Sequence, residues 1–285
     1  MQIGCQMAFN DYTSPDYIKQ AAQHVEEQGF HQFWVPEHVL FFPAYESRYP
    51  YSDDGRIAGD PRSLLDPFSA LTWVAAATSR IRLGTGICLV PQRNPVYTAK
   101  VVADLDFLSG GRFELGVGIG WLKEEFEALG IPWADRAGRT EECLGLMQAL
   151  WQEDAASYQG QYYQLNAAYQ GPKPVQTPHP PIVFGGESDA ALDRVARIGQ
   201  GWYGFNLTPQ TLEERLSYLA TRLEAAGRSM EDIRIYAGLH PSVRDRGDID
   251  RFEALGVEQI IVPVMAAKMD SLRERADRAM ARIMG

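Results

Sequence analysis

Cysteine is scarce in this sequence, and long apolar runs and clusters of positive charge are missing from it. Cys5, Cys88 and Cys143 are widely spaced and form no CxxC pair, a pattern typical of a reducing compartment and without a metal site. No stretch approaches the roughly 18 apolar residues that span a bilayer, and no basic segment with an apolar stretch opens the chain. Lys and Arg number 27 against 37 Asp and Glu and are scattered, so a nucleic-acid surface is not expected. These absences predict a cytoplasmic protein that acts on small molecules.

What the sequence does contain is a regular alternation of strand-like and helix-like segments. The helix expected at 14–29, for example, opens with Ser14 and Pro15 and closes at Gly29. The expected strands are 2–7, 30–38, 81–90, 113–120, 181–186, 201–205, 233–239 and 257–264. Alternation of this kind predicts a parallel sheet. Eight pairs in 285 residues favour a single (β/α)8 TIM barrel domain over 1–285 rather than an open doubly wound sheet.

Two segments interrupt the alternation and are expected as insertions at the C-terminal face of the barrel. The segment 39–66 is a long loop rich in Tyr and Pro, too long for a plain connector and therefore a candidate pocket wall. Its aromatic residues, among them Phe41 and Tyr45, either contact a substrate or simply cover the barrel mouth. The segment 155–180 is a second excursion, also rich in Tyr and Pro.

Unusual residues fall where the expected strands end, and in TIM barrels the chemistry collects at those ends. Glu37-His38 ends the second strand; imidazole exchanges protons near neutral pH, although a structural histidine is as reasonable. Gly84-Thr85-Gly86 lies inside the third strand, where glycines allow a bulge or a close ligand. Gly116–Gly120 reads GxGxG rather than GxGxxG and follows the fourth strand, not the first. A nicotinamide-binding loop is therefore rejected.

The fifth strand ends in Gly185-Gly186-Glu187-Ser188, which also opens a helix. Free N–H groups at such a helix start favour a phosphate, although a serine in this position is more often a plain helix cap. Because an inward Glu187 would repel a phosphate, we expect its carboxylate to be turned away. Arg136 and Arg139 either attract an anionic substrate or cofactor tail or form salt bridges with Glu141 or Glu142. The first strand carries no HxH pair, so no metal is expected.

Taken together and in this order, these motifs resemble the luciferase-like monooxygenase superfamily, and within it the branch that depends on the deazaflavin coenzyme F420. The stretches that carry the resemblance are VPEH, SRIRLGTGICLVPQRNP, LSGGRFELGVGIGWLKEEFEALG, ADRAGRTEECLGLMQALW and PPIVFGGESDAALDRVARIGQGW. The resemblance covers residues 1 to about 205, with these stretches in the order of the family. Each motif is weak singly, whereas five in order identify the family.

The resemblance implies roles for individual residues. Glu37 and His38 match an acidic-His pair beside the redox ring, with the histidine as acid or base. Gly86-Ile87 matches the position of a non-prolyl cis peptide behind that ring. Further residues are implied to line the cofactor, namely Gly120, Trp121 and Glu124, and to hold its phosphate, namely Gly185, Gly186, Glu187 and Ser188. Trp121 stands where the family's sugar-phosphate dehydrogenases carry a carboxylate, which favours an apolar substrate pocket formed with Phe41 and Tyr45.

The function implied is hydride transfer between coenzyme F420 and a small organic substrate, with His38 exchanging the accompanying proton. An FMN-dependent monooxygenase on the same barrel is the alternative. A flavin-binding protein without turnover is a second alternative, of another class. A homodimer is expected from the family alone.

Overall fold

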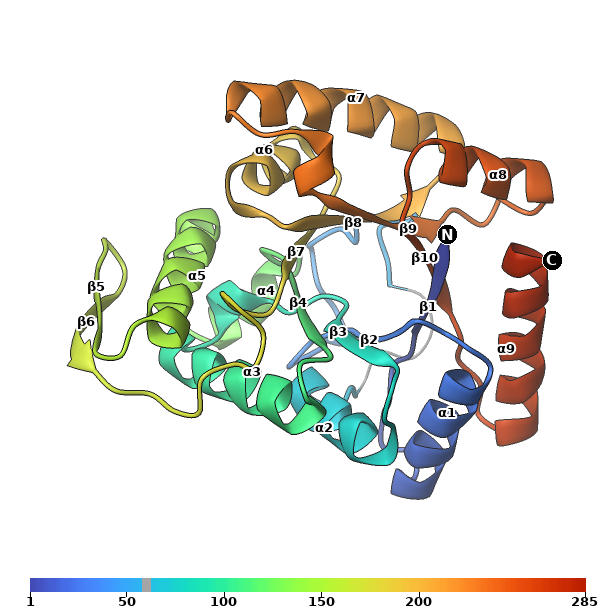
Figure 1. Ribbon diagram of the computed structural model, residues 1–285, viewed down its shortest axis with the longest axis horizontal. Helices are drawn as coiled ribbons and strands as arrows, with labels where there is room; N and C mark the ends of the chain where they lie inside the picture. Colours follow the sequence, from blue (N-terminus) through green and yellow to red (C-terminus); the bar gives the residue numbers. More distant parts are fainter. Residues whose placement is uncertain (58–62) are drawn as a thin grey trace.

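The computed structural model describes residues 1–57 and 63–285 of the chain. At its centre lies a closed barrel of parallel strands in the order β1-β10-β9-β8-β7-β4-β3-β2 (Figure 1). The barrel strands are β1 (Gln2–Gln6), β2 (Gln32–Val35), β3 (Arg82–Thr85), β4 (Phe113–Val117), β7 (Ile182–Gly185), β8 (Gly201–Leu207), β9 (Arg234–Leu239) and β10 (Gln259–Pro263). The barrel closes where β1 pairs with β10, so the predicted (β/α)8 barrel is confirmed.

Helices form a ring around these strands (Figure 1). They are α1 (Pro15–Glu27), α2 (Pro67–Ala77), α3 (Pro95–Ser109), α4 (Lys123–Ala128), α5 (Arg136–Gln152), α6 (Asp189–Ile198), α7 (Pro209–Ala225), α8 (Arg246–Ala254) and α9 (Met269–Met284). Short 3-10 helices occur at Val90–Gln92, Trp133–Asp135 and Met230–Asp232. Among residues 1–57 and 63–285, no helix combines the length and apolar character needed to cross a bilayer.

Local chemistry explains where the helices begin and end. Ser14 Oγ accepts a hydrogen bond from the Tyr17 N–H at 3.1 Å, and Pro15 occupies the first helical position of α1. Gly29, with a φ of +87°, follows the end of that helix in the left-handed region that glycine tolerates best. The predicted boundaries of α1 are therefore confirmed by its capping residues.

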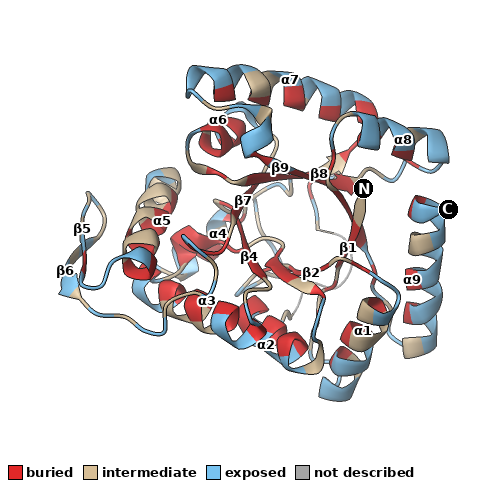
Figure 2. Cartoon of the chain, viewed as in Figure 1, coloured by how far each residue is buried: buried red, intermediate tan, exposed pale blue. Residues whose placement is uncertain are grey.

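Buried residues lie along the barrel strands and on the sides of the helices that face the barrel (Figure 2). Apolar side chains fill both the layer between helices and barrel and the barrel itself. The interior cluster consists of Trp34, Val183, Tyr203, Tyr236 and Ile261. A Cβ atom at Gly84 would lie 2.5 Å from the Trp34 ring. Gly84 is thus a glycine because the Trp34 side chain needs the space, not because a ligand approaches.

A buried carboxylate closes the N-terminal end of the barrel. Glu114 is fully buried and lies 3.0 Å from Arg82 Nη2 and 2.6 Å from Arg234 Nη1. It also accepts hydrogen bonds from Tyr236 Oη at 3.0 Å and Gln32 Nε2 at 3.2 Å. This polar network occupies the interior at one end, which leaves the C-terminal end for ligands.

The two insertions lie at different places. Residues 39–57 follow β2 at the C-terminal face as predicted, and residues 58–62 of the expected 39–66 loop lie outside the described residues. Residues 155–180 do not lie at that face. They form the hairpin of β5 (Ala156–Gln159) and β6 (Gln164–Ala168), which packs beside α5 on the periphery of the molecule (Figure 1). The prediction was wrong because this segment follows the helix α5 rather than a strand. In such a barrel the helices run back toward the N-terminal ends of the strands, so a segment after a helix starts away from the C-terminal face.

Candidate active site

His38 is the centre of a hydrogen-bonded group at the C-terminal end of the barrel. Its Nδ1 lies 3.0 Å from Glu125 Oε2, and Trp121 Nε1 donates to its Nε2 at 3.2 Å. Because Nε2 accepts from Trp121, Nδ1 must carry the proton and donate it to Glu125. The imidazole is therefore oriented from both sides, and Nε2 presents the lone pair.

Glu125 holds the hydrogen-bonded group around His38 together, and the sequence analysis did not identify it as a site residue. Its fully buried carboxylate also accepts hydrogen bonds from the Val39 N–H at 2.7 Å and Gln92 Nε2 at 3.0 Å. Burial raises the pKa of Glu125, but hydrogen bonds from His38, the Leu40 N–H and Gln92 outweigh burial and lower it. The carboxylate is thus ionised. A signal was present, because Glu125 shares the helical spacing of the buried residues Leu122 and Phe126.

Glu37, predicted to act with His38, is placed elsewhere by the structure. Its carboxylate accepts hydrogen bonds from the Leu89 N–H and from Arg93 Nε, both at 2.6 Å, and the residue is 4% exposed. Successive side chains of an extended segment point to opposite sides, so His38 and Glu37 diverge. Glu37 fixes the segment after β3 and does not face the pocket.

Aromatic rings surround His38. The ring of Phe41 lies 4.7 Å from the imidazole, centroid to centroid, and that of Trp121 lies 5.6 Å away. Tyr45 and Tyr49 pack edge-on against Trp121 at 5.7 and 5.2 Å. The residues predicted as substrate walls, Phe41, Tyr45 and Trp121, are therefore brought together around the imidazole.

Glu124, predicted to line the cofactor, anchors the loop after β2. Its carboxylate accepts hydrogen bonds from the Glu46 N–H at 2.6 Å, the Ser47 N–H at 3.1 Å and Ser47 Oγ at 2.7 Å. Desolvation raises the pKa of Glu124, but these hydrogen bonds outweigh desolvation and lower it to about 2. The aromatic residues of this loop are thereby held over the barrel mouth.

The glycines at the ends of β4 and β7 make room for one side chain. The Gly86–Ile87 peptide bond is cis, as the resemblance implies. A Cβ atom at Gly118 would lie 2.3 Å from Ile87 Cδ1, and one at Gly185 would lie 2.4 Å from the same atom. The space beside Gly118 and Gly185 is thus occupied by the side chain of Ile87. Gly120, with a φ of +80°, instead turns the chain toward Trp121.

The segment Gly185–Ser188 forms the start of α6. Ser188 Oγ accepts a hydrogen bond from the Ala191 N–H at 3.3 Å and so caps the helix. The carboxylate of Glu187 accepts a hydrogen bond from the Phe205 N–H at 2.7 Å, and burial raises its pKa. The carboxylate is thus held on β8, while the first N–H groups of α6 have no partner within the helix, as at any helix start.

Buried polar atoms at the barrel mouth have no partner within the described part of the chain. These atoms are Tyr203 Oη and Gln92 Oε1; the sequence suggested Gln92 as a polar group at the mouth, whereas Tyr203 was not identified. Tyr203 is 4% exposed, and a Cβ atom at Gly86 would be 3.7 Å from its ring. Buried polar groups are nearly always hydrogen-bonded, so a ligand with polar edges fits this place.

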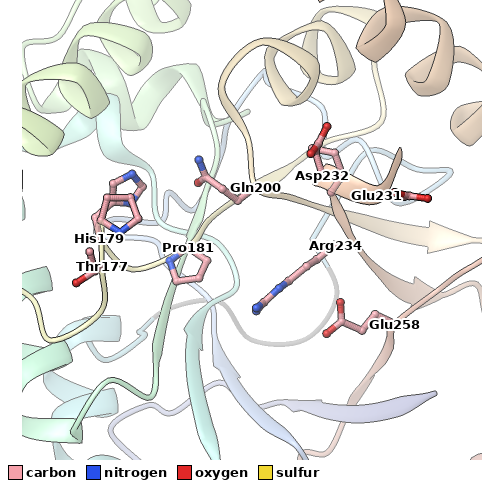
Figure 3. Close-up of a pocket in the computed structure, with 10 residues that line it drawn as sticks. Thr177, His179, Pro181, Gln200, Glu231, Asp232, Arg234 and Glu258 are labelled. Carbon is pink, nitrogen blue, oxygen red and sulfur yellow. The ribbon is translucent and has the colours of Figure 1, made fainter. Parts of the chain in front are cut away.

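A cavity of about 470 Å³ lies at the opposite end of the barrel, between the starts of β7 to β10 (Figure 3). Two of its polar side chains are engaged elsewhere: His179 Nε2 lies 3.1 Å from Gln148 Nε2, and Arg234 pairs with Glu114. It contains no predicted site residue. In the two described stretches, no three His, Cys, Asp or Glu side chains are arranged to hold a metal ion.

Comparison with known proteins gives a family and several relatives. The model of the luciferase-like monooxygenase family matches residues 3–284. An uncharacterised protein of Mycobacterium tuberculosis is 32% identical over 267 residues, which is 92% of each chain. The FMNH(2)-dependent dimethylsulfone monooxygenase of Pseudomonas putida is 32% identical over 194 residues, covering 67% of this chain and 48% of that protein.

Solved structures with the same fold match over nearly their whole length. The coenzyme F420-dependent tetrahydromethanopterin reductase of Methanopyrus kandleri superposes with a TM-score of 0.77 at 18% identity, covering 99% of this chain and 98% of that one. An F420-dependent secondary alcohol dehydrogenase gives 0.78 at 17% identity with the same coverage. At such identities the likeness concerns the fold.

Proposed function

This chain belongs to the luciferase-like monooxygenase family, whose members are oxidoreductases, and we propose that it transfers a hydride between coenzyme F420 and a small organic substrate. The observation that carries this proposal is His38, held between Glu125 and Trp121 inside an aromatic mouth. An oriented imidazole in such a pocket is suited to exchange a proton with a bound substrate.

The residues at the mouth fit a flavin-type cofactor. Gly86, Ile87, Gly120 and Trp121 would line its ring, and Tyr203 Oη would gain a hydrogen-bond partner, which the described residues do not provide. The start of α6, Gly185–Ser188, would hold its phosphate through backbone N–H groups. The cofactor would supply the ring carbon that takes or gives the hydride.

The protein's own groups would handle the proton. When the Trp121 N–H is displaced by substrate, the Nε2 lone pair of His38 becomes available to accept a proton. The charge of the resulting imidazolium would be stabilised by the buried Glu125 carboxylate, 3.0 Å from Nδ1. Phe41, Tyr45 and Trp121 would meanwhile exclude water and favour an apolar substrate.

The choice of coenzyme F420 over FMN is supported by the resemblance around Gly86-Ile87. The two F420-dependent structures correspond to this chain over 98% of their lengths, and a monooxygenase of Streptomyces bottropensis corresponds over 99% of its length. The FMNH(2)-dependent monooxygenase corresponds over 48% of its length. Its 32% identity nevertheless makes an FMN-dependent monooxygenase the second candidate. Retention of the complete barrel and of an oriented His38 disfavours a flavin-binding protein without turnover.

The location and assembly of the protein belong to the same proposal. Cys5, Cys88 and Cys143 are free, buried thiols, which fits the cytosol. We expect a homodimer, and a measurement of the mass in solution would decide it.

Titration of the purified protein with coenzyme F420, FMN and reduced FMN tests the cofactor. We expect micromolar affinity for coenzyme F420 and much weaker affinity for both forms of FMN, measured by fluorescence or calorimetry. Micromolar binding of FMN without binding of the deazaflavin would contradict the proposal and favour the monooxygenase.

A further inference from the structure

Arginines from two neighbouring helices lie together outside the barrel. Arg136 and Arg139 belong to α5, whereas Arg194 and Arg197 belong to α6. Arg194 Nε and Arg197 Nη2 share one carboxylate oxygen, Glu141 Oε1, at 3.3 and 2.5 Å. We refer to the four arginines as the arginine cluster, and Glu141 is the residue that links its two helices.

The arginine cluster has fewer carboxylates than positive charges. Glu142, the neighbour of Glu141, accepts hydrogen bonds from backbone N–H groups of the β5–β6 connection at 2.8 Å and is thus engaged elsewhere. Asp135 lies 3.9 Å from Arg139 Nε. Within the described residues, the salt bridges of the four guanidinium groups involve only Glu141 and Asp135. This excess of positive charge is notable in a chain with a net charge of −10.

Buried donors of the arginine cluster have no hydrogen-bond partner in the described part of the protein. Arg194 is 6% exposed, and its Nε lies 3.3 Å from Glu141 Oε1 without the alignment of a hydrogen bond. The buried Nε atoms of Arg136 and Arg139 likewise have no hydrogen-bond partner among the described residues. Burial lowers the pKa of Arg194, and burial together with the positive charge of Arg194 lowers that of Arg136. Such an arrangement costs free energy unless an anion accepts these hydrogen bonds.

The arginine cluster lies beside the helix start proposed to hold the cofactor phosphate. Arg194 follows Ser188 by six residues on the same helix, which is about 9 Å along its axis. Helical side chains lean toward the N-terminus, so the guanidinium comes closer still. A flexible chain attached to a phosphate at this helix start has about 10 Å or less to cover.

We propose that the arginine cluster binds carboxylates of the glutamate tail of coenzyme F420. This inference rests on the proposed function. The coenzyme carries a phosphodiester and glutamate residues beyond its ring, whereas FMN ends at its phosphate. Guanidinium groups bind carboxylates through paired hydrogen bonds. A bound carboxylate would supply an acceptor for the Nε atoms of Arg136 and Arg139, which have none among the described residues, and a better aligned one for Arg194 Nε. The arginine cluster therefore adds affinity for the tailed cofactor that FMN does not gain.

The test compares coenzyme F420 with the tail-less deazaflavin that lacks both phosphate and glutamates. In Arg194→Gln we expect the Kd for coenzyme F420 to rise about tenfold, and the Kd for the tail-less deazaflavin to change less than about twofold. Arg136→Gln, a half-buried position on the other helix, serves as the second variant should Arg194→Gln fail to fold. Arg222→Gln is the matched control, because Arg222 pairs with Asp193 at 2.6 Å on the exposed side of α7.

Two results would overturn the inference: an unchanged Kd for coenzyme F420 in both variants, or an equal loss for both ligands. If the wild-type protein binds no deazaflavin, the proposed cofactor is wrong, and γ-linked triglutamate alone then tests the arginine cluster. At matched ionic strength, triglutamate should then raise the unfolding temperature of the wild-type protein but not that of Arg194→Gln. This result would support a carboxylate-binding site at the arginine cluster even without coenzyme F420. No rise in the wild-type protein refutes it.

Discussion

At the scale of single residues, the chemistry depends on how each side chain of the mouth is held. Glu37 and His38 are adjacent in sequence, yet one is fixed on Arg93 and the other on Glu125. The same contrast separates Glu124, which holds a loop, from Glu125, which orients the imidazole. Residues that are neighbours in the sequence therefore have different functions, even where both carry a carboxylate, as Glu124 and Glu125 do.

His38→Ala should lower kcat about 100-fold or more, because an oriented acid–base group contributes that much, while the cofactor Kd changes less than about twofold. Turnover is measured with a substrate found for the cofactor-loaded enzyme. His240→Ala is the control, since His240 follows β9 and its Nδ1 lies 2.6 Å from Ser242 Oγ. An unchanged kcat in His38→Ala would remove the imidazole from the mechanism.

Trp121→Phe separates the two contacts of this side chain, because phenylalanine keeps an aromatic ring but loses the N–H that donates to His38. We expect KM to fall by up to about tenfold with kcat nearly constant, because the substrate no longer has to displace this neutral hydrogen bond from His38. Steady-state kinetics measures both parameters. A fall in kcat as large as that of His38→Ala would mean that the indole N–H itself takes part in the reaction.

At the scale of elements, the loop after β2 is kept over the barrel by one carboxylate. Three hydrogen bonds from Glu46 and Ser47 join the loop to Glu124, at the start of α4. Because α4 also carries Glu125, one helix both orients His38 and holds the loop that carries Phe41 and Tyr45. Loop position and imidazole orientation are therefore coupled through α4.

The contribution of Glu124 to stability should depend on pH in a defined window. Its pKa is lowered from 4.5 to about 2 in the folded protein, so the stabilisation is complete above about pH 4.5 and is lost as the pH falls toward 2. The difference in unfolding free energy between wild type and Glu124→Gln, from urea titrations at several pH values, should shrink over this range. A difference that stays constant down to pH 2.5 would contradict the assignment of this anchor.

At the scale of the whole molecule, the two ends of the barrel have separate tasks. The Glu114 network fills the N-terminal end with paired charges, whereas at the C-terminal end Tyr203 Oη and Gln92 Oε1 are buried without a partner among the described residues. Stability and ligand binding are thus assigned to opposite ends, as is general for this fold.

Glu114→Gln should lower the unfolding free energy by roughly 2–3 kcal/mol, because it leaves Arg82 and Arg234 without their carboxylate. This is less than the roughly 3–5 kcal/mol of a fully buried pair, since both arginines stay partly hydrated. Glu127→Gln is the control: its exposed pair with Lys123 should contribute less than about 1 kcal/mol. Urea unfolding measures both, and equal losses would contradict the proposed role of Glu114.

The sequence by itself determined the barrel and the helix boundaries, because alternation, capping residues and strand length are local properties. It also placed His38 and the aromatic loop at the correct end, since strand ends share one face of a parallel barrel. Only the tertiary structure decided which carboxylate meets His38, why Gly118 and Gly185 are small, and where residues 155–180 lie. Those outcomes depend on contacts between residues far apart in the chain, such as Glu125 with His38 and Ile87 with Gly185.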